Sequence, residues 1–262
     1  GAVIMQGGLI MIPTLAIILS ARILPVRVLG SKPRAGSMIL ATTIGIPAAV
    51  VFQGINNLMI YALVQSGLKL PAAGGPAAPA LFSRPLPVIL LIIIVSAILP
   101  GISEELMFRG VIYPSLASTG SGMSAMIWQA AAFSLFHGNP LFILPPFLAG
   151  LMLAAIRKNS GSLLPPILTH ISLNITLAAL APLLPQLTAD YVSLGSSDAR
   201  SLLYASLIAA CIAAVALVPL LVLINLPADH GDRDGRFRPF PADWKFGLAF
   251  SILIVTMIIE SN

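Results

Sequence analysis

Long uninterrupted runs of hydrophobic residues, separated by short polar or proline-rich segments, are the main feature of this sequence. A transmembrane helix needs about 20 consecutive apolar residues, and the runs are continuous rather than alternating at the period of two that is typical of a membrane β-barrel. The pattern therefore predicts an all-α fold, a polytopic transmembrane helical bundle with about eight spans. The expected spans are residues 2–23, 37–64, 86–116, 122–136, 141–156, 162–184, 202–224 and 244–259.

Composition supports a membrane protein, since 58% of the residues are hydrophobic and only 9% are charged. A mean hydropathy of +0.99 excludes a soluble globular domain. The net charge is +5, but the basic residues lie in short loops between apolar runs, where they set topology and contact anionic lipids. We therefore expect the lipid bilayer, and not nucleic acid, to be the partner of these charges.

The basic loops also predict an orientation. In an eight-span alternation the loops at residues 22–34, 157–158 and 233–245 fall on one side of the membrane and carry most of the Lys and Arg. The positive-inside rule makes this side cytoplasmic, so both termini are expected outside. Because the sequence shows no internal repeat and no separate soluble domain, we expect one integral membrane domain over residues 1–262.

The third expected span contains the only two acidic residues among the first 188, Glu104 and Glu105. An ionised side chain at membrane depth costs at least ~2.5 kcal/mol, so such a pair indicates a functional site. On a helix Glu105 and Arg109 share a face, which predicts an ion pair, while Glu104 is rotated by about 100° and can point into a cavity. Pro100 and Gly101 just before the pair predict a kink or a break.

Two histidines lie in other apolar runs, each four residues from a second residue that shares its helical face. These pairs are Phe133 with His137 and His170 with Asn174. Polar groups on separate helices of an apolar bundle satisfy one another, so we expect them to meet the glutamates. A buried glutamate can activate water as a general base, a histidine can position that water, and His170 with Asn174 offers two donors for an oxyanion. The residues therefore predict hydrolysis of an amide.

The sequence lacks the catalytic motifs of other classes of intramembrane protease. The sequence contains no HExxH motif, Ser121 lies in TGSG rather than GxSG, and the first seven expected spans hold no acidic residue besides the glutamate pair. A metallopeptidase, a rhomboid-like serine enzyme and a two-aspartate protease are thus disfavoured. Zinc held by Glu104, His137 and His170 is the one metal alternative, because carboxylate and imidazole are competent ligands; we expect no metal or other cofactor.

Three motifs then occur in a fixed order, EELMFRG at residues 104–110, FSLFH at 133–137 and HISLN at 170–174. They match EExxxR, FxxxH and HxxxN, and in this order the chain resembles the CPBP family of CAAX proteases and bacteriocin-processing enzymes, also called ABI proteins. The Ras-converting CAAX endopeptidase belongs to this family. The resemblance covers a motif core at residues 102–175. It implies an eight-helix intramembrane glutamate protease, open to the cytosol, that cleaves a membrane-associated protein or peptide precursor, with lipidated CAAX proteins as one substrate class.

The resemblance also implies catalytic roles by motif position. Glu104 and His137 would activate the water, and His170 and Asn174 would form the oxyanion site.

The remaining motif residues would support the catalytic ones. Arg109 would fix Glu105 and the local helix geometry, and Phe133 would be either a cavity wall or a packing residue. For the site to assemble, the helix that ends at His137 must stop at mid-depth, with Asn139 and Pro140 breaking the chain. The segment at residues 115–123 would then lie below the membrane.

Two other functions use the same residues. A noncatalytic membrane scaffold or regulator would keep the polar cluster for packing and for binding a partner. A proton- or ion-coupled transporter would use Glu104 and His137 as a relay, although the sequence lacks the repeated halves of such transporters.

Overall fold

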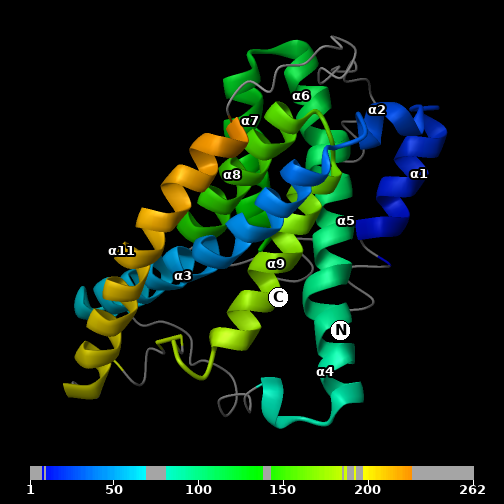
Figure 1. Cartoon of the computed structure of the whole chain (residues 1–262). Coiled ribbons are helices and arrows are strands. Elements are labelled where there is room, and N and C mark those ends of the chain that lie inside the picture. Colours follow the sequence, from blue (N-terminus) through cyan, green and yellow to red (C-terminus); the bar gives the residue numbers. More distant parts are fainter. Residues whose placement is uncertain are drawn as a thin grey trace.

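Helices make up nearly all of the described protein, which confirms the predicted all-α fold (Figure 1). The eighth expected span, at residues 244–259, and the charged loop expected before it lie outside the described part. The structure is a computed structural model, and it describes residues 8, 10–68, 81–137, 143–184, 186–187, 192 and 197–225.

The helices follow the order of the expected spans. The helical stretch Leu86–Thr119 is interrupted by two π turns, labelled η3 and η4. The bounds are α1 (Ile12–Ser20), α2 (Pro25–Leu29), α3 (Ala35–Gln65), η2 (Leu81–Ser83), α4 (Leu86–Ile93), η3 (Ile94–Ile98), α5 (Leu99–Met107), η4 (Phe108–Ile112), α6 (Tyr113–Thr119), α7 (Gly122–Phe136), α8 (Leu144–Ser160), α9 (Leu164–Leu180) and α11 (Ser197–Asn225).

Three stretches of helix are long and apolar enough to cross a membrane, namely Ala35–Gln65, Leu86–Thr119 and Asp198–Ile224. Gly122–Phe136 and Leu164–Leu180 are shorter apolar helices. These helices show a multi-pass integral membrane protein. They do not show eight membrane crossings, so the number of spans stays a prediction.

Each π turn in the helix from α4 to α6 ends two residues before a proline, Pro100 after η3 and Pro114 after η4. A proline ring clashes with the carbonyl four residues earlier, and in both cases that carbonyl lies inside the π turn. The wider turn relieves the clash without ending the helix. The kink or break expected at Pro100 is therefore a π turn, and the helix continues through it.

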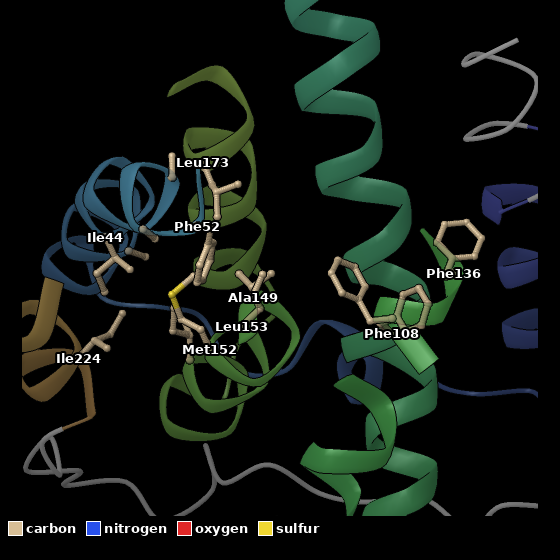
Figure 2. Packing of buried hydrophobic residues seen from close by; sticks show 14 of the residues in the cluster. Ile44, Phe52, Phe108, Phe136, Ala149, Met152, Leu153, Leu173 and Ile224 are labelled. Atoms are coloured by element: carbon tan, nitrogen blue, oxygen red, sulfur yellow. The ribbon is translucent and has the colours of Figure 1, made fainter. Parts of the chain in front are cut away.

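The main apolar core lies between α3, α8, α9 and α11 and extends to the phenylalanines of η4 and α7. Figure 2 shows Phe52 of α3 between Leu173 of α9 above it and Met152 of α8 below it. Figure 1 shows α9 running beside the long helix from α4 to α6, with which it makes many contacts. This packing places α9 next to the segment that carries the glutamates.

The turn between α2 and α3 pairs with the turn between α8 and α9. Gly30 and Ser162 form an isolated antiparallel bridge, the Ser31 amide donates to the Gly161 carbonyl at 3.0 Å, and the Leu163 amide donates to the carbonyl of the last α2 residue at 2.8 Å. Two of the three basic loops therefore lie at the same end of the bundle, as the alternation predicts. The third is outside the described residues.

Candidate active site

Glu105 and Arg109 form the ion pair that their spacing predicts. Glu105 lies in α5 and Arg109 in η4, and Arg109 Nη1 is 2.6 Å from Glu105 Oε1. Neither side chain has any solvent exposure. Removing one member of such a pair would leave an uncompensated buried charge, which costs about 3–5 kcal/mol. The pair therefore fixes the turn that follows the glutamates.

His170 of α9 lies between the two glutamates. Its Nδ1 is 2.9 Å from Glu105 Oε1, and its Nε2 is 4.0 Å from Glu104 Oε2. Because an ionised carboxylate only accepts hydrogen bonds, Nδ1 carries the proton in the bond to Glu105. This bond directs Nε2 toward the side of Glu104. A distance of 4.0 Å is too long for a direct hydrogen bond, and one water molecule at about 2.8 Å from each atom would bridge it.

Two glycines bring α9 close enough for these contacts. A Cβ on Gly45 of α3 would lie 2.6 Å from the Thr169 carbonyl oxygen, and one on Gly101 of α5 would lie 2.5 Å from Ile171 Cγ1. The Thr169 hydroxyl also donates to a carbonyl of α3 at 2.8 Å. Small residues allow helix backbones to approach closely in membranes. The residues on either side of His170 are thus held by α3 and α5.

Phe133 of α7 covers the ion pair. The guanidinium carbon of Arg109 is 4.3 Å from the centre of the Phe133 ring, and the edges of Phe108 and His170 approach the same ring at centroid distances of 5.0 and 5.9 Å. Phe133 is buried. A cation over an aromatic face is attracted by the ring quadrupole, so Phe133 packs onto Arg109 as well as closing the cluster from one side.

His137 lies at the edge of this cluster. Helix α7 ends at Phe136, immediately before His137, which confirms the expected helix end. The His137 ring is exposed, its Nδ1 is 2.8 Å from the Phe133 carbonyl, and its centroid is 4.8 Å from that of Phe133. Within the described part of the chain, no hydrogen bond or ion pair joins His137 to Glu104. Asn139 and Pro140 are outside that part, and the depth of the helix end stays a prediction.

Asn174 lies one helical turn beyond His170 on α9 and is half-buried. Four-residue spacing places both side chains on the same face of the helix. The structure gives Asn174 no hydrogen-bond partner among the residues it describes, so its role as an oxyanion donor stays a prediction.

Gln129 is a buried residue of this region that the motifs do not include. Its Nε2 donates to the Gly150 carbonyl at 2.9 Å, and Arg109 Nη2 donates to the same oxygen at 3.2 Å. The Gln129 side chain is completely buried. Spacing could have found it, because Gln129, Phe133 and His137 are successive positions on one helical face.

The three side chains considered for zinc are not gathered into one site. Within the described residues, no group of three or more His, Cys, Asp or Glu side chains is placed to hold a metal ion. His170 lies between the glutamates, whereas His137 packs against the Phe133 ring.

Comparison with protein families gives one match. Residues 86–176 match the family described as Rce1-like, type II CAAX prenyl endopeptidase Rce1-like. The matched segment begins with the first residue of α4 and ends within α9, so it contains all the residues named in this site except Gly45 of α3. Comparison with curated proteins and with solved structures found no match.

Proposed function

Because residues 86–176 carry a domain of the Rce1-like type II CAAX prenyl endopeptidase family, we propose that this protein is an intramembrane endopeptidase. Its substrate would be a membrane-associated protein or peptide precursor, with lipidated CAAX-type proteins as the first class to test. The reaction would be hydrolysis of a peptide bond by a water molecule that side chains of the domain activate.

One observation carries this proposal. Two buried carboxylates share one imidazole, in a chain whose first 188 residues hold no other acid. Such a group is costly to place in an apolar bundle, and ionisable residues at membrane depth mark functional sites. Glu105 binds Arg109 and His170 Nδ1 directly, whereas the Glu104 carboxylate lies 4.0 Å from His170 Nε2, and we assign these last two groups to the reaction.

The proposed reaction begins with a water molecule between Glu104 and His170. Glu104 accepts a proton from this water while the water oxygen attacks the carbonyl carbon of the scissile bond. The carbonyl oxygen becomes an oxyanion. Collapse of the tetrahedral intermediate re-forms the carbonyl and breaks the C–N bond, and the protonated Glu104 returns its proton to the leaving amine. Water is consumed and Glu104 ends as it began.

His170 can serve this reaction through Nε2 in either protonation state. When only Nδ1 carries a proton, Nε2 accepts a hydrogen bond from the water; when both nitrogens are protonated, Nε2–H donates to the oxyanion. Asn174 would supply a second donor to the oxyanion. We also assign His137 to positioning the water. Its ring lies next to Phe133, at the border of the cluster.

The remaining residues would position these groups. Glu105 orients the imidazole, as carboxylates orient histidines in many enzymes. Arg109 holds Glu105, and Phe133 packs on the guanidinium. The site would open toward the end of the bundle that carries the basic loops, which the positive-inside rule makes cytoplasmic.

The test is cleavage of a library of lipidated and unlipidated peptides by the purified wild type and by Glu104→Gln, each with and without a strong zinc chelator. Asp198→Asn is the matched control, since it converts an exposed acid of α11 to an amide. We expect chelator-resistant cleavage by the wild type and the control, with a loss of about 10³-fold or more in Glu104→Gln.

Other outcomes lead to other functions. Cleavage that stops on chelation would require a metal. A folded wild type that cleaves nothing, or biological activity that survives in Glu104→Gln, would favour the noncatalytic scaffold.

A further inference from the structure

Helix α2 exposes apolar and basic side chains on the same short element. Leu24, immediately before it, is 58% exposed, and Val26 and Leu29 are 65% and 53% exposed. Arg27 is exposed between them. Such a combination is typical of a segment in the membrane interface, where apolar side chains reach the acyl chains and cations stay among the headgroups. Helix α2 therefore has the composition of an interfacial element rather than of a solvated loop.

The inner side of α2 is fixed to the turn that follows the glutamates. Val28 is its buried residue and packs against Val111 of η4. Arg157, which is only 1% exposed, donates from Nη2 to the Val28 carbonyl at 3.0 Å and from Nε to the Arg109 carbonyl at 3.4 Å. Because one buried guanidinium bonds to both backbones, the outer side of α2 keeps a fixed position relative to the candidate active site.

Three more exposed cations lie at the same end of the bundle. Arg22 comes three residues before α2. Lys32 follows Ser31, whose amide donates to the Gly161 carbonyl, and Lys158 lies about one turn before Gly161 in α8. The paired turns thus bring cations from two distant segments together. We call the four exposed cations of this end, Arg22, Arg27, Lys32 and Lys158, the basic surface.

No acid of the described residues is exposed at this end. Those residues include Glu104 and Glu105, which are buried, and Asp198 in the first turn of α11 as their only acids. Helix α11 begins at the other end, since Ala199 packs with Ile60 near the end of α3. Within the described part of the chain, no ion pair includes the basic surface. Its charges therefore favour a negatively charged partner.

The level of the basic surface fits the dimensions of a bilayer. A helix rises about 1.5 Å per residue, so Val111, beside α2, lies about 37 Å from Leu86 at the other end of the same helical stretch (Figure 1). A bilayer with its headgroups is about 40 Å thick. Trp128, 66% exposed, lies about 9 Å along α7 from Gly122, and a Cβ on Gly122 would be 3.8 Å from Lys158 Nζ. Tryptophan favours the border between headgroups and acyl chains, so Trp128 puts Lys158 at headgroup depth.

We propose that the basic surface and the outer side of α2 form a binding site for the headgroups of anionic phospholipids, with Val26 and Leu29 at the acyl boundary. A negatively charged bilayer matches both the cations and the exposed apolar side chains, whereas a soluble acidic peptide matches only the cations. This site belongs to the folded protein whether or not it cleaves a peptide. Through Val28 and Arg157, lipid binding there would reach the turn that carries Arg109.

The test is native mass spectrometry of the full chain in detergent, with phosphatidylglycerol or with phosphatidylcholine of the same acyl chains added. We expect the wild type to bind phosphatidylglycerol more tightly. Each cation near an anionic surface contributes a factor of about five, so Arg27→Gln with Lys32→Gln should weaken phosphatidylglycerol binding by about 25-fold. Its binding of phosphatidylcholine should change little.

Two control variants separate this site from net charge. Arg84→Gln with Arg200→Gln also removes two positive charges, but next to the starts of α4 and α11 at the opposite end, and it should keep the wild-type preference. Arg27→Lys with Lys32→Arg keeps both charges and should keep the preference too. Raising the salt concentration from 0.1 to 0.5 M should reduce the preference of the wild type without any substitution. The salt series decides the question if the glutamine variant does not fold.

A second measurement locates α2 in a bilayer. Cys211 is the only cysteine, so a Cys211→Ala background allows one fluorophore to be attached to Val26→Cys. In bilayers with phosphatidylglycerol, a nitroxide near the lipid headgroup should quench this label more strongly than acrylamide in the water does. The control label on Ile208→Cys, an exposed position in the middle of α11, should be quenched best by a nitroxide deep in the acyl chain.

Several results would overturn the lipid site. These are equal binding of the two lipids by the wild type, an unchanged preference in the folded Arg27→Gln, Lys32→Gln variant, and an equal loss in the variant of the opposite end. A label at residue 26 that only acrylamide quenches would also overturn it. Glycerol phosphate should not displace phosphatidylglycerol, and displacement would make the ligand a soluble phosphate. Binding of a soluble oligoglutamate that the glutamine variant loses, with lipid preference unchanged, would assign the surface to acidic peptides instead.

Discussion

The candidate active site and the seam between α3 and α11 are both buried, yet they are held together by different interactions. In the site, Arg109, Glu105 and His170 satisfy one another through hydrogen bonds of 2.6 and 2.9 Å. In the seam, Gly54 lies so close to α11 that a Cβ would be 2.6 Å from the Ala210 Cβ. The site depends on polar partners and the seam on shape, so they should respond to different substitutions.

The largest expected effect is that of Arg109→Met. This variant removes the cation that Glu105 needs and leaves a buried carboxylate beside His170, which should lower the free energy of unfolding by about 3–5 kcal/mol. Unfolding in detergent measures the change, with Arg200→Met, an exposed arginine of α11, as the control.

The double variant Arg109→Met with Glu105→Leu sharpens this result. Because it removes both charges, it should recover part of the lost stability while leaving any peptide cleavage abolished. If the double variant were less stable than Arg109→Met alone, the buried ion pair would not be the cause of the loss.

A smaller effect is expected in the seam. Gly54→Ala should lower the free energy of unfolding by about 1–3 kcal/mol, since the new methyl group meets Ala210 and the backbone of Ser206. Gly36→Ala is the control, because a Cβ on Gly36 has no neighbour within 4 Å. The pH profile of cleavage should be unchanged in both variants.

A second substitution tests the cause of the stability loss in Gly54→Ala. Ala210→Gly removes the atom nearest to the new methyl group and should restore most of the stability that Gly54→Ala loses. Additive losses in the double variant would show that shape is not what holds α3 to α11.

The smallest effect is expected for Gln129→Leu. The Gly150 carbonyl loses one donor but keeps Arg109, so the free energy of unfolding should fall by only about 1 kcal/mol. We expect kcat to fall severalfold with an unchanged KM. Gln129 and Arg109 donate to the same Gly150 carbonyl, so without Gln129 this carbonyl holds the Arg109 side chain less firmly. Gln53→Leu, a half-buried glutamine of α3 whose side chain donates to Asn57 of the same helix, is the control and should leave kcat unchanged.

Local spacing predicts the parts of the site that lie within one helix. The pair of Glu105 and Arg109 follows from a separation of four residues, and the bounds of α7 are those of the span expected at residues 122–136. Such contacts depend on helix geometry alone, which the sequence specifies.

Contacts between distant segments were beyond the reach of the same reasoning. Arg157 and Lys158 look alike in the sequence, and only the approach of Val28 and Arg109 makes one of them buried. Gln129 shares a face with Phe133, but its partner Gly150 is on another helix. The sequence predicts that His170 meets the glutamates, which the structure confirms, but which of its atoms bonds to which carboxylate depends on how α9 packs against α5.

The order of synthesis determines when the two paired turns, between α2 and α3 and between α8 and α9, can meet. Ser31 and Gly161 are 130 residues apart, so the bond between them forms only after most of the described helices have left the ribosome. His170 follows later still. Until then the helix with the glutamates has its own Arg109 in the same turn, and this local pair allows it to enter the bilayer with one carboxylate already neutralised. The local ion pair can thus form before the rest of the polar cluster, which is complete only once α9 brings in His170.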